Sequence, residues 1–190
     1  MKFYPLCCVN DDVTFSLNRW DGSLRKTRTH SFLRTGKLFS SNCSVKKAVA
    51  LCHNPFLIKS LPISNGAQNT SFSKKDHETA GRVASIMRCL CSVNFFLARL
   101  YASLPQPLFE SAGEAISFFR SHFHEDQDSL CLPRALFAAK TSRRFQRDGV
   151  VLVGAFLPAR DMHAWVIEGG SQADQEDCYW INYQPVAALA

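Results

Sequence analysis

One stretch of the chain constrains the fold more than any other, because one helical pattern and two strand patterns follow each other there. Leucine and alanine recur at helical spacing over residues 132–139, and Pro133 stands where a first-turn proline is tolerated. The apolar run 150–157, rich in β-branched residues, is typical of a buried strand, and a second strand pattern covers 163–167. We therefore predict an α+β fold in which a helix packs on an antiparallel sheet.

A cysteine opens the predicted helix, which we expect to continue as far as Gly149. Asp128 and Ser129 are good N-cap residues, so Cys131 falls in the first helical turn. Free backbone N–H groups and the positive end of the helix dipole stabilise a thiolate at such a position. Cys131 is therefore a candidate nucleophile.

A histidine opens the second predicted strand, after the loop 158–162. Alternation along a strand places His163, Trp165 and Ile167 on one face, and we expect this face to point at the helix. The thiol and the imidazole then meet within hydrogen-bond reach, as a nucleophile and its base do. A single buried cysteine or histidine is more often structural, so the indication of catalysis comes from the ordered pair.

Four motifs follow one another along the chain: Cys-Leu-Pro-Arg-Ala-Leu from Cys131, Val-Leu-Val-Gly-Ala from Val151, His-Ala-Trp-Val from His163, and Tyr-Gln-Pro-Val from Tyr183. This order resembles the B proteins of lasso-peptide biosynthesis, bacterial leader peptidases with a transglutaminase-like fold, over roughly residues 79–190. The resemblance implies a transglutaminase-like or papain-like cysteine peptidase domain at 79–190. It also implies a small winged-helix-like module at 1–72 that recognises the leader of a precursor peptide by strand addition.

The third member of the site is less clear, because the family usually places an Asn-Asp pair where this chain has Asp174-Gln175. The resemblance makes Asp174 the candidate that orients His163. A shift of one residue aims the side chain at the other face unless a bulge follows Gly169 and Gly170. Gln175 and Asp177 remain alternatives, and the acidic segment also fits a solvated turn.

The resemblance implies a peptidase that frees the core of a lasso precursor and passes it to an ATP-dependent, asparagine-synthetase-like cyclase. The chain has no phosphate-binding loop, and we expect no cofactor. Two alternatives stay open: an acyl or amide transferase on the same fold, and a non-catalytic leader-binding scaffold.

The chain before the peptidase domain has its own pattern. The polar run 64–78 lacks apolar periodicity and predicts a linker or an exposed loop. Before it, alternation at 13–17 predicts a strand, and short helices are expected at 31–38 and 43–52. After it, we expect one helix from residue 80 and a second over 110–123. The core candidates on these two helices are Val83, Ile86, Met87, Leu90, Phe95, Leu97, Leu100, Ile116, Phe119 and Phe123.

Charge and cysteine usage narrow the class of protein. The net charge is +6, and residues 1–60 hold ten basic against three acidic side chains, so the excess of positive charge lies there. The basic stretch 25–30 lacks the pattern of a nucleic-acid motif, and we expect no nucleic-acid partner.

The apolar region 86–104 is interrupted by two arginines, so we expect no membrane contact and a cytoplasmic protein whose eight cysteines are reduced. No cysteine or histidine spacing is typical of a metal site.

Overall fold

The computed structural model describes residues 3–5, 13–17, 24–28, 62, 72–91, 107–123, 130–156, 161–173 and 183–189. The helices in this part are α3 (Lys74–Cys91), α5 (Ala112–Phe123), α6 (Cys131–Thr141) and α7 (Arg143–Asp148). The strands are β1 (Phe3–Pro5), β2 (Val13–Leu17), β3 (Leu24–Arg28), β4 (Val150–Phe156), β5 (Asp161–Glu168), β6 (Ser171–Gln172) and β7 (Gln184–Leu189). The helices predicted at 31–38 and 43–52 lie outside the described residues.

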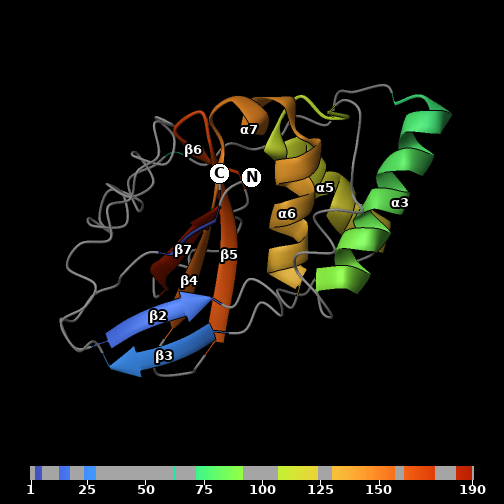
Figure 1. Ribbon diagram of the computed structural model, residues 1–190. Helices are drawn as coiled ribbons and strands as arrows, with labels where there is room; N and C mark the ends of the chain where they lie inside the picture. Colours follow the sequence, from blue (N-terminus) through green and yellow to red (C-terminus); the bar gives the residue numbers. More distant parts are fainter. Residues whose placement is uncertain are drawn as a thin grey trace.

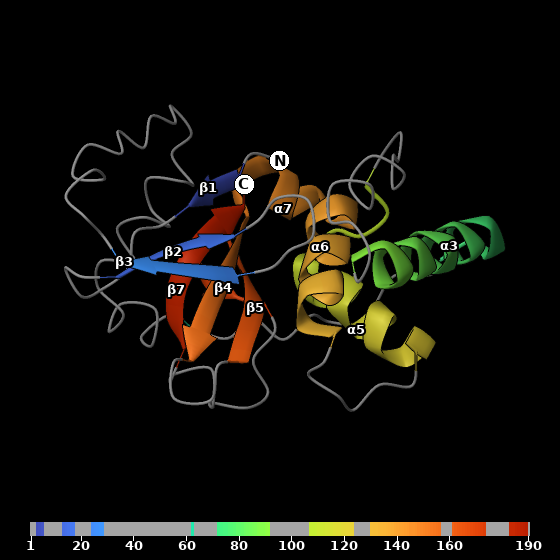
Figure 2. The same ribbon diagram turned by 60° about the horizontal axis from the view of Figure 1, so that its bottom comes forward.

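Helices and an antiparallel sheet make up the described fold. Five strands form one sheet in the order β1-β7-β4-β5-β6, and every neighbouring pair in it is antiparallel. The hairpin β2–β3 is a separate sheet that contacts β7 and crosses the strands β7 and β4 in Figure 2. Helix α6 lies beside β5, and α3 and α5 pack outside α6 (Figure 1). The strands predicted at 13–17 and 150–157 are confirmed, and β5 begins two residues before His163.

The first strand of the chain belongs to the same sheet as the last described one. Phe3 is paired with Leu189, and Pro5 with Ala187. A segment that the sequence assigned to the N-terminal module thus forms the edge of the sheet that carries β4 and β5.

The helix that begins with Cys131 is confirmed, but its predicted end at Gly149 is wrong. Helix α6 stops at Thr141, because Ser142 takes an extended conformation with φ −89° and ψ 130°. The Ser142 hydroxyl accepts a hydrogen bond from the N–H of Phe145 at 3.1 Å and so caps α7. At the other end of α6 the N-cap residue is Leu130, whose side chain makes no capping bond, and the predicted cap residues Asp128 and Ser129 lie outside the described residues.

Helix α3 begins inside the segment that we predicted to be a linker. Its first turn contains Lys74 and Lys75, and Ser73 precedes it. The Ser73 hydroxyl accepts from the N–H of Asp76 at 3.2 Å and donates to its carboxylate at 2.6 Å. The polar side chains of 73–78 are therefore an N-cap and the first, largely exposed residues of a helix, which explains why this stretch shows no apolar periodicity.

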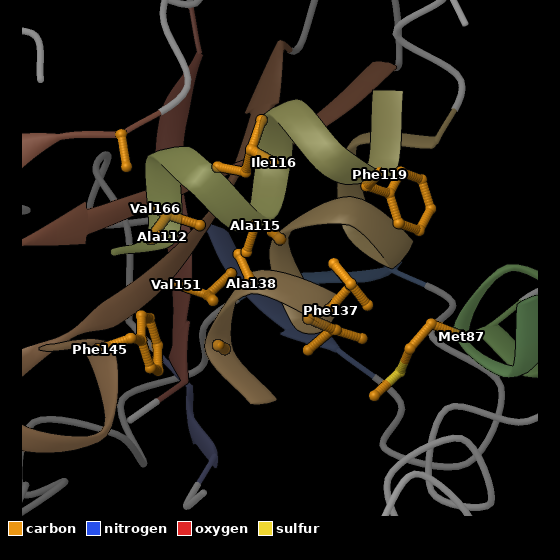
Figure 3. Packing of buried hydrophobic residues seen from close by; sticks show 14 of the residues in the cluster. Met87, Ala112, Ala115, Ile116, Phe119, Phe137, Ala138, Phe145, Val151 and Val166 are labelled. Atoms are coloured by element: carbon orange, nitrogen blue, oxygen red, sulfur yellow. The ribbon is translucent and has the colours of Figure 1, made fainter. Parts of the chain in front are cut away.

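The core lies between the helices and one face of the sheet (Figure 3). Helix α6 supplies small side chains and one large ring, so it approaches the sheet closely while Phe137 fills the space toward α5. The members from the rest of the described residues are Ala80, Val83, Ala84, Met87, Phe109, Ala112, Ala115, Ile116, Phe119, Phe145, Val151, Val153, Ala164, Val166 and Ala173. The predicted core roles of Val83, Met87, Ile116 and Phe119 are confirmed.

Candidate functional site

Strand β5 has two buried faces with different neighbours. Ala164 and Val166 belong to the cluster of buried residues that α6 forms with the sheet, and Val153 lies opposite Ala164 on β4. Trp165 is fully buried but is not a member of that cluster. Because side chains alternate along a strand, Ala164 and Val166 face α6, and His163 and Trp165 face away from it.

The imidazole of His163 lies in an aromatic cluster on the face of the sheet that points away from α6. Its ring centroid is 6.0 Å from that of Trp165 in a stacked arrangement and 5.5 Å from that of Tyr183. Phe156 lies 5.8 Å from Tyr183 in turn. The residue opposite His163 on β4 is Gly154, and a side chain there would meet the Trp165 ring at 2.7 Å. The indole ring of Trp165 therefore occupies the space that a side chain at position 154 would need.

Cys131 is buried as the first residue of α6, and the cluster around it is apolar. Helix α6 and strand β5 run in the same direction, because Ser142 after α6 bonds to Glu168 at the end of β5. The 11 residues of α6 extend over about 16 Å. The five steps from Glu168 back to His163 also extend over about 16 Å. Cys131 therefore lies level with His163, at the same end of the sheet.

The predicted orientation of His163 is wrong. Ala164, and not His163, faces the helix that carries Cys131, since Ala164 and Cys131 belong to one buried cluster and the His163 ring stacks on Trp165. His163 and Trp165 share one face of β5, as predicted, but this face points away from α6 and not toward it. The catalytic roles of Cys131 and His163 stay predictions. Asp174, with its alternatives Gln175 and Asp177, lies outside the described residues.

A buried arginine near the thiol was missed by the sequence analysis. Arg134 follows Cys131 by three residues on α6 and is 3% exposed. Residues three apart on a helix are neighbours on its surface. The sequence contained a signal for this unusual residue, since Arg134 is the one charged side chain in the otherwise apolar stretch between Cys131 and Ala139.

A buried carboxylate at the far end of β5 was also missed. The N–H of Ala112 donates to both carboxylate oxygens of Glu168 at 3.0 Å, and the Ser142 hydroxyl donates to one of them at 2.8 Å. Burial raises the pKa of Glu168, and the hydrogen bonds and the charge of Arg144 oppose this shift only in part. Glu168 thus joins the start of α5, the start of α7 and the end of β5. This arrangement is structural, because one donor is a backbone N–H in the first turn of α5 that needs an acceptor and the other is the side chain that caps α7.

Within the described residues, no group of three or more histidine, cysteine or acidic side chains is arranged to hold a metal ion. In the same part of the chain, every helix is too short or too polar to cross a membrane.

The chain was compared with protein-family models, curated proteins and solved structures, and none of them matches it. The motifs of the sequence and the positions of Cys131 and His163 are therefore the basis on which a function is proposed.

Proposed function

We propose that this chain is a transglutaminase-like cysteine peptidase that removes the leader from a lasso-peptide precursor in the cytoplasm. The observation that carries the proposal is the position of Cys131 as the first residue of α6, the helix that packs on the strand β5 that carries His163. A helix packed on an antiparallel sheet is the arrangement that this chemistry uses. The four ordered motifs of the sequence support the same class of enzyme.

In the proposed reaction, the sulfur of Cys131 attacks the carbonyl carbon at the leader–core junction after its proton passes to His163. The C–N bond then breaks, and His163 returns the proton to the leaving amine of the core peptide. Water hydrolyses the thioester, which releases the leader carboxylate and restores the thiol. In this reaction, backbone N–H groups at the start of α6 bind the oxyanion.

The orientation of His163 adds a requirement to this reaction. Rotation about side-chain bonds cannot carry the imidazole through the sheet to the α6 side. The first residues of β5 must therefore leave their register with β4, where His163 lies opposite Gly154 and Met162 opposite Ala155. A shift by one residue exchanges the faces of a strand, so a change limited to the end of β5 is sufficient.

The partners in this proposal are the leader of the precursor and an ATP-dependent cyclase. The peptidase supplies the free amine of the core, and the cyclase uses this amine to close the ring. Any use of ATP belongs to the cyclase.

The experiment that tests the proposal is a cleavage assay with the precursor peptide encoded beside this chain, read by mass spectrometry. We expect Cys131→Ala to abolish the separate leader and core masses. Cys89→Ala is the matched control, because Cys89 is an exposed cysteine on α3 that forms no disulfide, and its loss should leave cleavage unchanged. Full cleavage by Cys131→Ala would exclude the peptidase.

A second function, a non-catalytic leader-binding scaffold, is favoured by the separation of the two faces of β5. If the His163 ring stays with Trp165 and Tyr183, it has a packing role and the thiol has no base. His163→Phe distinguishes the two functions, because phenylalanine keeps the aromatic packing and cannot accept a proton. For a peptidase, we expect a loss of kcat of about 10²–10⁴-fold with little change in leader binding. A scaffold would bind the leader and show no cleavage even in the unchanged chain.

A further inference from the structure

Three arginines gather on α7 around one carboxylate. Nitrogen atoms of Arg143, Arg144 and Arg147 lie 3.8, 3.6 and 3.7 Å from the carboxylate oxygens of Glu110. The arginine side chains are 55–68% exposed. Each distance is longer than the limit of about 3.2 Å for a good N–H···O bond. Glu110 therefore reduces the repulsion among the arginines but leaves their guanidinium groups able to bind another acceptor.

The backbone under these arginines is held in place. The N–H of Arg143 donates to the carbonyl of Phe109 at 2.9 Å, and the N–H of Arg144 donates to that of Glu110 at 3.1 Å. Phe145, between the arginines, is buried in the core. A surface whose backbone is already ordered loses less entropy on binding.

We propose that this arginine cluster, Arg143, Arg144 and Arg147 around Glu110, is a docking surface for a partner protein that presents a group of carboxylates. Guanidinium groups bind carboxylates through two parallel hydrogen bonds, and arginine is enriched in protein interfaces. The cluster lies beyond the opposite end of α6 from Cys131, so a bound partner leaves the thiol end of the sheet accessible. The inference does not depend on the proposed peptidase activity.

The extent and composition of the cluster favour an acidic protein over a nucleic acid. Helix α7 has six residues and is about 9 Å long, which is short for the series of phosphate contacts that nucleic-acid binding needs. The aromatic residue of α7, Phe145, is buried and cannot stack on a base. Glu110 within the cluster and the exposed Asp148 at the end of α7 would repel a continuous row of phosphates.

The test measures binding of a labelled hexaglutamate peptide to the full chain by fluorescence anisotropy at low salt. We expect the triple variant Arg143→Gln, Arg144→Gln, Arg147→Gln to bind about tenfold more weakly, a change of about 1.4 kcal/mol. The matched control is Lys74→Gln, Lys75→Gln, Arg82→Gln, which removes the same charge from exposed positions of α3. This control should bind as the unchanged chain does.

Four results would overturn the inference. The first is an equal loss in both triple variants, which would mean that only net charge matters. The second is tighter binding of a single-stranded oligonucleotide of equal charge that also depends on the three arginines. The third is the absence of peptide binding to the unchanged chain, and the fourth is unchanged binding by a folded α7 variant. If the triple variant does not fold, Arg147→Gln replaces it, because its side chain is 68% exposed, and it should bind about two- to threefold more weakly.

Discussion

The two faces of β5 are both buried, but different interactions hold them. On the face toward α6, small side chains pack closely, and Glu168 closes one end through hydrogen bonds to two helix starts. On the other face, His163 and Trp165 stack beside a glycine with no side chain of its own. A carboxylate with directed bonds and a set of packed rings respond differently to substitution and to pH. Variants on the two faces therefore show which face the stability depends on.

The largest effect is expected at Glu168. Glu168→Ala leaves the hydroxyl of Ser142 and the N–H of Ala112 buried without their acceptor. We expect the free energy of unfolding to fall by about 2–4 kcal/mol in urea denaturation. Glu168→Gln keeps an acceptor oxygen and should lose less than half of that. An alanine variant as stable as the unchanged chain would mean that these bonds contribute nothing net.

A smaller effect is expected on the aromatic face. In Gly154→Ala, the new methyl group would lie 2.7 Å and 2.8 Å from two atoms of the Trp165 ring and 3.0 Å from Cβ of Tyr183. We expect a loss of about 1–3 kcal/mol, measured by thermal unfolding, because a buried indole cannot move aside freely.

The control for Gly154→Ala is Gly81→Ala. There the new atom would lie 2.9 Å from the His122 ring, which is exposed and can rotate. Alanine is also the better helix former, so Gly81→Ala should change stability by less than about 1 kcal/mol. An equal loss in both variants would show that the aromatic face is not specially packed.

The smallest effect is a dependence of stability on pH that comes from Glu168 on the α6 face. Burial raises the pKa of Glu168 in the folded chain above its unfolded value. The protonated acid is therefore favoured by folding, and the stability that it contributes is present below the unfolded pKa. It is lost as pH rises through the raised pKa. In urea denaturation from pH 4 to 8, the stability of the unchanged chain relative to Glu168→Gln should fall with rising pH. A difference that stays constant or increases would contradict this.

The sequence predicted the strands β2, β4 and β5, but it did not predict which face of β5 meets the helix. Both faces of β5 are apolar, since Ala164 and Val166 alternate with Trp165 and Ile167. Alternation therefore shows which residues share a face, but it does not show which of the two faces packs on the helix. The histidine suggested that its face meets the cysteine. The small residues of α6 instead pack on the face that allows the closest approach.

Two further errors have physical causes that local patterns do not contain. Helix α6 ends at Thr141 with neither glycine nor proline there, because the Ser142 hydroxyl is held by Glu168, a residue distant in sequence. Glu168 shares the face of Ala164 and Val166, and nothing in its local sequence marks it as buried. Its burial depends on the helix starts that the fold brings to it.

The pairing of β1 with β7 has a consequence for how the chain reaches its native state. Phe3 and Leu189 are partners in one ladder although almost the whole polypeptide separates them. Closing such a loop costs conformational entropy before the contacts formed can repay it, and contacts of this kind slow folding. The edge of the sheet is therefore expected to form late, after β4 and β5 have already joined as a local hairpin.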